Sequence, residues 1–216
     1  MTGPAAPAPA LLASIGVPTA ARMGALGRRL APMLRAGDLI VLNGQLGAGK
    51  TTLVRGIGEG LDVRGPVTSP TFVIARVHPP LGGGPALVHV DAYRLSSPAE
   101  VDDLDLDADL DRSVTVVEWG GGLVEGLAAD WLDVTIGRPA PVLATGLATV
   151  SEPGPAGQPG AGGPPDPGDE PRTVTLTGWG ERWTAAAGSV RARLTGVPAG
   201  RDRLPRSPGP GHDRLP

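Results

Sequence analysis

The sequence contains no cysteine, which excludes disulfide bonds, thiolate metal sites and cysteine nucleophiles. Phenylalanine and tyrosine occur once each, so valine, leucine and alanine must fill the core. No apolar run is long enough to span a membrane. The N-terminal stretch has no basic residue before Arg22 and is interrupted by prolines, unlike a secretory signal. These absences predict a soluble, cytoplasmic protein.

Glycine (34) and proline (25) together exceed a quarter of the 216 residues, and they are clustered. Such clusters bury too little apolar surface to order themselves, and the length suits one domain with tails. We therefore predict a disordered lead over residues 1–18 and an ordered domain over 19–137. A flexible insertion follows over 138–171, and a closing strand and helix of the same domain over 172–195. Residues 196–216 are predicted to be a disordered basic tail.

Hydrophobic periodicity places strands and helices in alternation along the ordered domain. Thr19 is a candidate N-cap for an amphipathic helix that ends near Gly37. Another helix is predicted over 51–61, a short one opens at Pro98, and one closes the domain over 183–194. Strands are predicted over 39–42, 71–77, 86–90, 114–117, 131–136 and 173–177, with the second and third paired as a hairpin. This order predicts an α/β three-layer sandwich with a mostly parallel sheet.

A glycine-rich segment lies between the predicted strand 39–42 and the helix 51–61. It satisfies the phosphate-loop pattern G-x-x-x-x-G-K-[ST] with Gly44, Gln45, Leu46, Gly47, Ala48, Gly49, Lys50 and Thr51. The glycines let backbone N–H groups face the phosphates, and the helix N-terminus adds partial positive charge. We expect this loop, with Thr52 after it, to bind ATP.

Lys50 and Thr51 carry the specific chemistry of such a loop. Lys50 should reach the β- and γ-phosphates, and the Thr51 hydroxyl should ligate Mg²⁺. A shuffled sequence of this composition would contain the pattern roughly 0.003 times. Lys50 is also the only lysine in a chain that otherwise uses arginine for positive charge. The pattern therefore predicts a P-loop nucleoside triphosphatase.

Two acidic residues each follow a predicted strand that is mostly apolar. A P-loop enzyme needs a carboxylate at such a position to hold magnesium or to position water. Asp91 follows 86–90 and Glu118 follows 114–117. We predict Lys50, Asp91 and Glu118 as catalytic residues and Thr51, Asp91 and Glu118 around the metal. Glu118 is favoured for positioning magnesium or water, and Asp91 for the Walker B-type role.

Two other kinds of metal site are not supported by the sequence. The acidic run 102–111 does not fit a calcium loop, because Arg112 stands where that loop needs glycine. The three histidines lack metal-site spacing, so His89 is interpreted as a strand residue.

The charge distribution also bears on nucleic-acid binding. Residues 1–144 contain 11 basic and 15 acidic residues. Such an acidic domain is a poor direct platform for RNA.

Taken together, the phosphate loop and three further segments resemble the bacterial TsaE family. The segments are Val67-Thr-Ser-Pro-Thr-Phe72, His89-Val-Asp-Ala-Tyr-Arg-Leu95 and Val117-Glu-Trp-Gly120. The resemblance covers residues 19–136 and extends to 172–194. It implies a Mg-dependent ATPase that acts with two partners, TsaD-like and TsaB-like, in threonylcarbamoyl modification of adenosine 37 in ANN-decoding tRNAs, with the tRNA reached through the complex.

By motif position, the resemblance implies that residues 68–71 form a switch-like segment and that Asp91 and Glu118 form an acidic pair. Trp119 and Tyr93 would flank the nucleotide or a partner surface; core packing is the alternative for Trp119. Gln45 stands where the family often has an acid, so no carboxylate role is assigned there.

Two other functions remain open from the sequence. A small-molecule kinase on the same scaffold needs an arginine-rich lid, and residues 120–136 contain no arginine. A nucleotide-gated binding module would bind ATP without turnover.

Overall fold

The computed structural model describes residues 8–70, 73–137 and 170–196. Along the chain its elements are β1 (Ala10–Val17), α1 (Ala20–Leu30), η1 (Ala31–Met33), β2 (Leu39–Gly44), α2 (Lys50–Gly60), β3 (Ala75–His78), β4 (Ala86–Asp91), α3 (Pro98–Asp102), α4 (Leu106–Leu110), β5 (Ser113–Glu118), η2 (Glu125–Leu127), β6 (Trp131–Gly137), β7 (Arg172–Trp179) and α5 (Glu181–Thr195). None of the described helices has the length and apolar character needed to cross a membrane.

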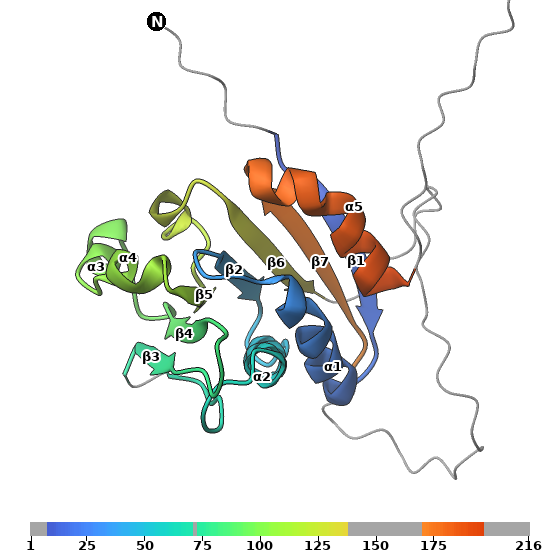
Figure 1. The fold of residues 1–216 in the computed structure, drawn as a ribbon, viewed down its shortest axis with the longest axis horizontal. Coiled ribbons are helices and arrows are strands. Elements are labelled where there is room, and N and C mark those ends of the chain that lie inside the picture. Colours follow the sequence, from blue (N-terminus) through green and yellow to red (C-terminus); the bar gives the residue numbers. More distant parts are fainter. Residues whose placement is uncertain (1–7, 71–72, 138–169, 197–216) are drawn as a thin grey trace, which may run out of the picture.

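The strands form one sheet in the order β1-β7-β6-β2-β5-β4-β3 (Figure 1). Neighbouring strands among β6, β2, β5 and β4 are parallel. The pairs β3–β4, β6–β7 and β1–β7 are antiparallel, so five of the seven strands run in the same direction. This confirms the predicted α/β class with a mostly parallel sheet.

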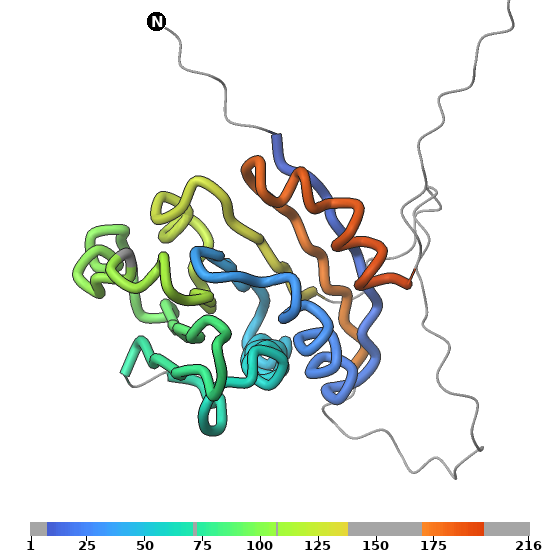
Figure 2. Tube along the Cα trace, in the orientation of Figure 1, coloured from blue at the N-terminus to red at the C-terminus, as the bar shows by residue number. Residues whose placement is uncertain are grey.

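Helices cover both faces of the sheet, as the sequence predicted. Strand residues such as Ile40 and Val116 pack with α1, α2 and α5 on one face. Val41 and Val90 pack with residues of α3 and α4 on the other. The core is mainly aliphatic, with the fully buried Trp183 as the large exception. The tube in Figure 2 shows α1 beside α2.

Close contact between α1 and α2 fixes the helix that begins at the phosphate loop. A Cβ atom on Gly27 would lie 2.4 Å from the carbonyl oxygen of Leu53, and one on Gly56 would lie 2.1 Å from that of Gly24. Only glycine fits at positions where two backbones approach this closely. The glycines of α2, which look like poor helix formers in the sequence, therefore serve packing.

Helix α1 begins as predicted and ends early. The Thr19 side chain accepts a hydrogen bond from the Arg22 backbone N–H at 3.2 Å, which is an N-cap. The helix ends at Leu30 rather than near Gly37, because Pro32 follows and the chain continues as the 3₁₀ turn η1.

The prediction of a disordered lead is wrong for residues 10–17. This segment is β1, which pairs antiparallel with β7 from Ala10 opposite Gly178 to Val17 opposite Arg172. It buries Leu12 and Val17 in the core. Its partner strand is distant in the sequence, so local composition gave no sign of the pairing. Residues 1–7, most of the predicted insertion (138–169) and residues 197–216 of the predicted tail lie outside the described residues.

The predicted hairpin is confirmed, with a later start. Strand β3 begins at Ala75 and pairs antiparallel with β4, His78 opposite Leu87. Thr71 and Phe72 lie outside the described residues. The closing strand and helix also form, as β7 and α5.

Candidate functional site

The phosphate-loop pattern lies in the turn that joins β2 to α2, as predicted. Gly44, Gly47 and Gly49 have φ angles of 150°, 76° and 104°, values that L side chains rarely adopt. A Cβ atom at Gly44 would also lie 2.7 Å from the carbonyl oxygen of Ile136 on β6. The glycines therefore set the path of the loop, and Gly49 leads directly into α2.

Lys50 is held at the start of α2 by the loop itself. Its Nζ donates hydrogen bonds to the carbonyl oxygens of Gly44 at 2.8 Å and Gln45 at 3.2 Å. Burial lowers the pKa of Lys50 from its usual value, while the negative charges of Glu118 and Asp91 act in the opposite direction. The ammonium group is thus placed beside two carboxylates, close to the loop that would receive phosphate.

The two predicted acids end neighbouring parallel strands. Asp91 on β4 stands opposite Glu118 on β5 in the sheet register, so both side chains emerge at the same edge. Both are buried, at 7% and 3% exposure. A parallel sheet places its ligand sites outside the carboxyl ends of its strands, which is where these residues lie.

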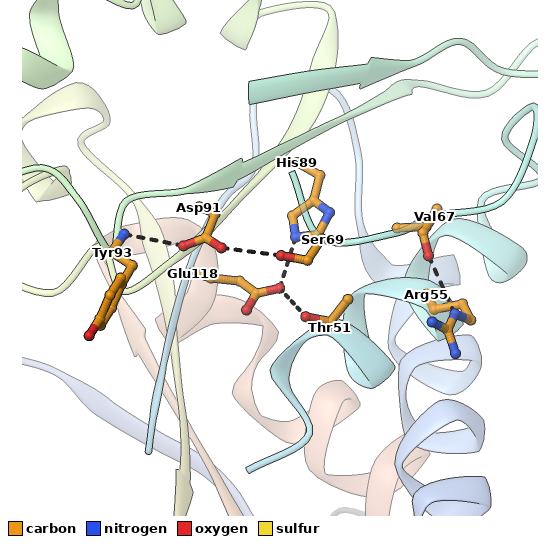
Figure 3. A network of polar contacts seen from close by, with 8 residues as sticks. All are labelled: Thr51, Arg55, Val67, Ser69, His89, Asp91, Tyr93 and Glu118. Carbon is orange, nitrogen blue, oxygen red and sulfur yellow. Dashed lines mark hydrogen bonds and ion pairs between the residues drawn. The ribbon is translucent and has the colours of Figure 1, made fainter. Parts of the chain in front are cut away.

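The contacts of the two acids differ. The Thr51 hydroxyl donates to Oε1 of Glu118 at 2.9 Å (Figure 3). Asp91 accepts hydrogen bonds from the Ser69 hydroxyl and the Tyr93 backbone N–H, each at 3.2 Å. The sequence favoured Asp91 for the Walker B-type role. In the structure the contact with the phosphate-loop hydroxyl belongs to Glu118.

His89 is a site residue that sequence reasoning missed. It lies in β4, as interpreted, and its Nε2 is also 2.9 Å from Oε1 of Glu118 (Figure 3). The available signal was the spacing His89-x-Asp91, which places both side chains on the same face of a strand. That spacing did not reveal the carboxylate of the neighbouring strand.

An aromatic pair borders the site. Trp119 has a left-handed backbone conformation, with φ 62°. Its backbone N–H donates a hydrogen bond to the Leu42 carbonyl oxygen at 3.0 Å. Lys50 Nζ lies 3.7 Å from the Trp119 ring centroid, and Tyr93 meets the same ring edge-to-face at 5.3 Å. Trp119 is therefore placed at the site and not in the core.

These side chains line a cavity of about 410 Å³, a size typical of small-ligand sites. The lining comprises residues 46–52 together with Ser69, Asp91, Tyr93, Glu118 and Trp119. The first two residues of the predicted binding loop, Gly44 and Gln45, hold Lys50 through their carbonyl oxygens and are not part of this lining.

The residues present fit a magnesium ion that arrives with a nucleotide. Within the described ranges no three His, Asp or Glu side chains gather as a self-sufficient metal site. Mg²⁺ commonly takes one or two protein oxygens and completes its shell with substrate phosphates and water. The Thr51 hydroxyl and the Glu118 carboxylate, which line the cavity, would supply such oxygens.

The strand–loop–helix arrangement and the sheet define a P-loop NTPase-like fold. A Bacillus subtilis crystal structure, YdiB, shares this fold, with a TM-score of 0.55 and 23% identity over 82% of this chain and 93% of that one.

Sequence comparison then gives the family. A family model described as threonylcarbamoyl adenosine biosynthesis protein TsaE matches residues 17–140. A Streptomyces coelicolor protein named tRNA threonylcarbamoyladenosine biosynthesis protein TsaE is 58% identical over 79% of this chain and 99% of its own length. A Mycobacterium leprae protein of the same name is 55% identical over 53% of this chain and 75% of its own. The chain belongs to the TsaE family.

Proposed function

We propose that the chain is a Mg-dependent ATPase required for tRNA threonylcarbamoyladenosine biosynthesis, the process in which its family takes part. The single observation that carries the ATPase proposal is the 2.9 Å hydrogen bond from the Thr51 hydroxyl to the buried Glu118 carboxylate, beside Lys50. This is the meeting of phosphate-loop hydroxyl, lysine and strand-end acid that magnesium-assisted phosphate chemistry requires.

Each of these residues has a distinct task in the proposed reaction. Lys50 binds the terminal phosphates, and the loop N–H groups bind the oxygens around them. Thr51 and Glu118 would hold the magnesium ion that accompanies the nucleotide. That ion would supply positive charge to stabilise the charge developing on the phosphate oxygens.

Asp91 organises a different wall of the same cavity. Its two carboxylate oxygens accept from Ser69, on the segment predicted to be switch-like, and from the Tyr93 backbone. We propose that Asp91 fixes this segment where the γ-phosphate and the attacking water meet. The choice of adenine follows from the family alone.

We propose that hydrolysis serves a partner complex in the cytoplasm, made of TsaD-like and TsaB-like proteins, through which the chain acts on the tRNA. Two large apolar side chains at the cavity, Leu46 and Tyr93, are 91% and 65% exposed. Exposed apolar groups beside a polar site are typical of a surface that a partner protein covers.

The test is ATP hydrolysis by the purified chain, alone and with the partner complex. We expect partner-stimulated turnover that Lys50→Ala and Glu118→Gln abolish. Glu59→Gln is the matched control, because Glu59 lies on the exposed side of α2 and pairs only with Arg28 among the described contacts. Phosphorylation of a small molecule would indicate a kinase. ATP binding without any turnover would indicate a gated binding module.

A further inference from the structure

A histidine of the sheet contacts the carboxylate of Glu118, which is proposed above to hold magnesium. His89 Nε2 and Glu118 Oε1 are 2.9 Å apart, and the two side chains are 0% and 4% exposed. In the β4–β5 register His89 stands opposite Val116, and Asp91 stands opposite Glu118. His89 and Glu118 are therefore on the same face of adjacent strands, one step apart along the sheet.

The direction of this hydrogen bond follows from the chemistry of its two groups. A carboxylate only accepts, so the Nε2–H group of His89 must donate. The other ring nitrogen, Nδ1, is buried and has no hydrogen-bond partner in the described part of the chain. An unpaired buried polar atom costs stability that an apolar side chain at this strand position would avoid. The Glu118 contact is the polar interaction that the histidine gains in exchange.

The other buried histidine gives a contrast within the same sheet. His78 is also buried, at 4% exposure, and its Nε2, like Nδ1 of His89, has no hydrogen-bond partner in the described part of the chain. Among the described hydrogen bonds and ion pairs, none joins His78 to Glu118, whereas His89 contacts it. The two residues have similar burial and differ in whether they contact Glu118.

Two donors converge on the same oxygen of Glu118. Thr51 donates from the first turn of α2, and His89 donates from β4 (Figure 3). The second carboxylate oxygen, Oε2, makes no hydrogen bond among the described contacts. We propose that His89 is a positioning residue that fixes the Glu118 carboxylate toward the phosphate loop, so that its second oxygen serves the metal and water of the proposed ATPase. This inference rests on the proposed function.

The contact itself is tested without nucleotide, by NMR of the imidazole N–H protons. We expect a slowly exchanging, downfield Nε2–H signal in the wild type that His89→Gln and Glu118→Ala remove and His78→Gln retains. Assignment of His89 to the Nδ1–H tautomer, or a signal unchanged in Glu118→Ala, would overturn the proposal. This readout stands whether or not the chain hydrolyses ATP.

The positioning role is tested by kinetics with the partner complex. Loss of a hydrogen bond that orients a metal-side ligand costs about 10- to 100-fold. We expect His89→Leu to lower kcat by that factor while KM for ATP changes less than about threefold, since nucleotide binding rests on the loop and Lys50. His89→Gln, whose amide N–H can replace Nε2–H, should stay within about threefold of wild type.

His78→Leu is the matched control for loss of a buried histidine and should retain wild-type kcat. If His89→Leu fails to fold, the kinetic comparison uses His89→Met, which also lacks an N–H donor, because a purely steric role predicts no preference for a donor. Equal loss in the two His89 variants, or no loss in either, overturns the inference. No turnover in the wild type contradicts the proposed function instead.

Discussion

The Lys50 ammonium group lies 3.7 Å from the centre of the Trp119 ring, while its protons bond the carbonyl oxygens of Gly44 and Gln45. The atoms that accept hydrogen bonds from the only lysine of the chain are therefore neutral backbone carbonyl oxygens, although two carboxylates lie nearby. Phosphate is the stronger partner for an ammonium group. Nucleotide binding is therefore expected to draw Lys50 away from the ring.

Trp119 should report that movement. We expect Mg-ATP to change the intrinsic tryptophan fluorescence, because loss of a cation from a ring face alters its surroundings. Trp119→Phe should remove most of the change, whereas Trp179→Phe, which alters the stacked Trp131–Trp179 pair instead, should retain it. An undiminished response in Trp119→Phe would contradict this movement.

ATP turnover should depend on the hydroxyl group of Thr51 more than on the shape of its side chain. Thr51→Val keeps the shape and removes both the metal ligand and the donor to Glu118. We expect it to lower Mg-supported turnover by about 100-fold, the scale of losing one oriented group at a phosphoryl site, and Thr51→Ser to remain near wild type. Chelation of magnesium should abolish turnover in both active proteins. Thr184→Val, which removes a hydroxyl on α5, is the control.

The close approach of α1 and α2 predicts opposite effects for two glycines of one helix. Gly27→Ala places a Cβ 2.4 Å from backbone, and we expect a loss of about 1–3 kcal/mol in the free energy of unfolding. At Gly24 the nearest atom is 3.6 Å away, on the flexible Arg28 side chain. Gly24→Ala should stabilise α1 by about 0.5–1 kcal/mol through helix propensity. Urea denaturation distinguishes the two outcomes.

The buried His78 side chain should lower the free energy of unfolding in mild acid. Burial, the largest cause, lowers the pKa of His78 below its usual value of 6.5, so the unfolded chain takes up the proton first as pH falls. Stability should decrease from pH 6.5 downward until the lowered folded-state pKa is passed, by at most about 1.4 kcal/mol per pH unit from this group. His78→Gln should make the decrease shallower in urea titrations, with no difference in slope above pH 7.5. An unchanged acid slope would contradict the prediction.

Much of the fold follows from local pattern. The phosphate loop, the strand before it and the helix after it were predicted together, because glycine placement and periodicity constrain a short stretch of chain. The same holds for α5 and for the β3–β4 hairpin. Strand β1 was missed because a strand is stabilised by its neighbour, and the neighbour of β1 is β7, at the other end of the described chain.

The sequence by itself determined which side chains could serve the site: a loop with Lys50 and Thr51, and acids at the ends of two strands. Only the tertiary structure decided which of them meet. Register between β4 and β5 sets Asp91 beside Glu118, and the placement of α2 against the sheet gives the Thr51 contact to Glu118. The His89 contact and the position of Trp119 over Lys50 also join residues far apart in the chain. Local propensities act over a few residues, whereas hydrogen bonds across a sheet depend on how distant segments pack.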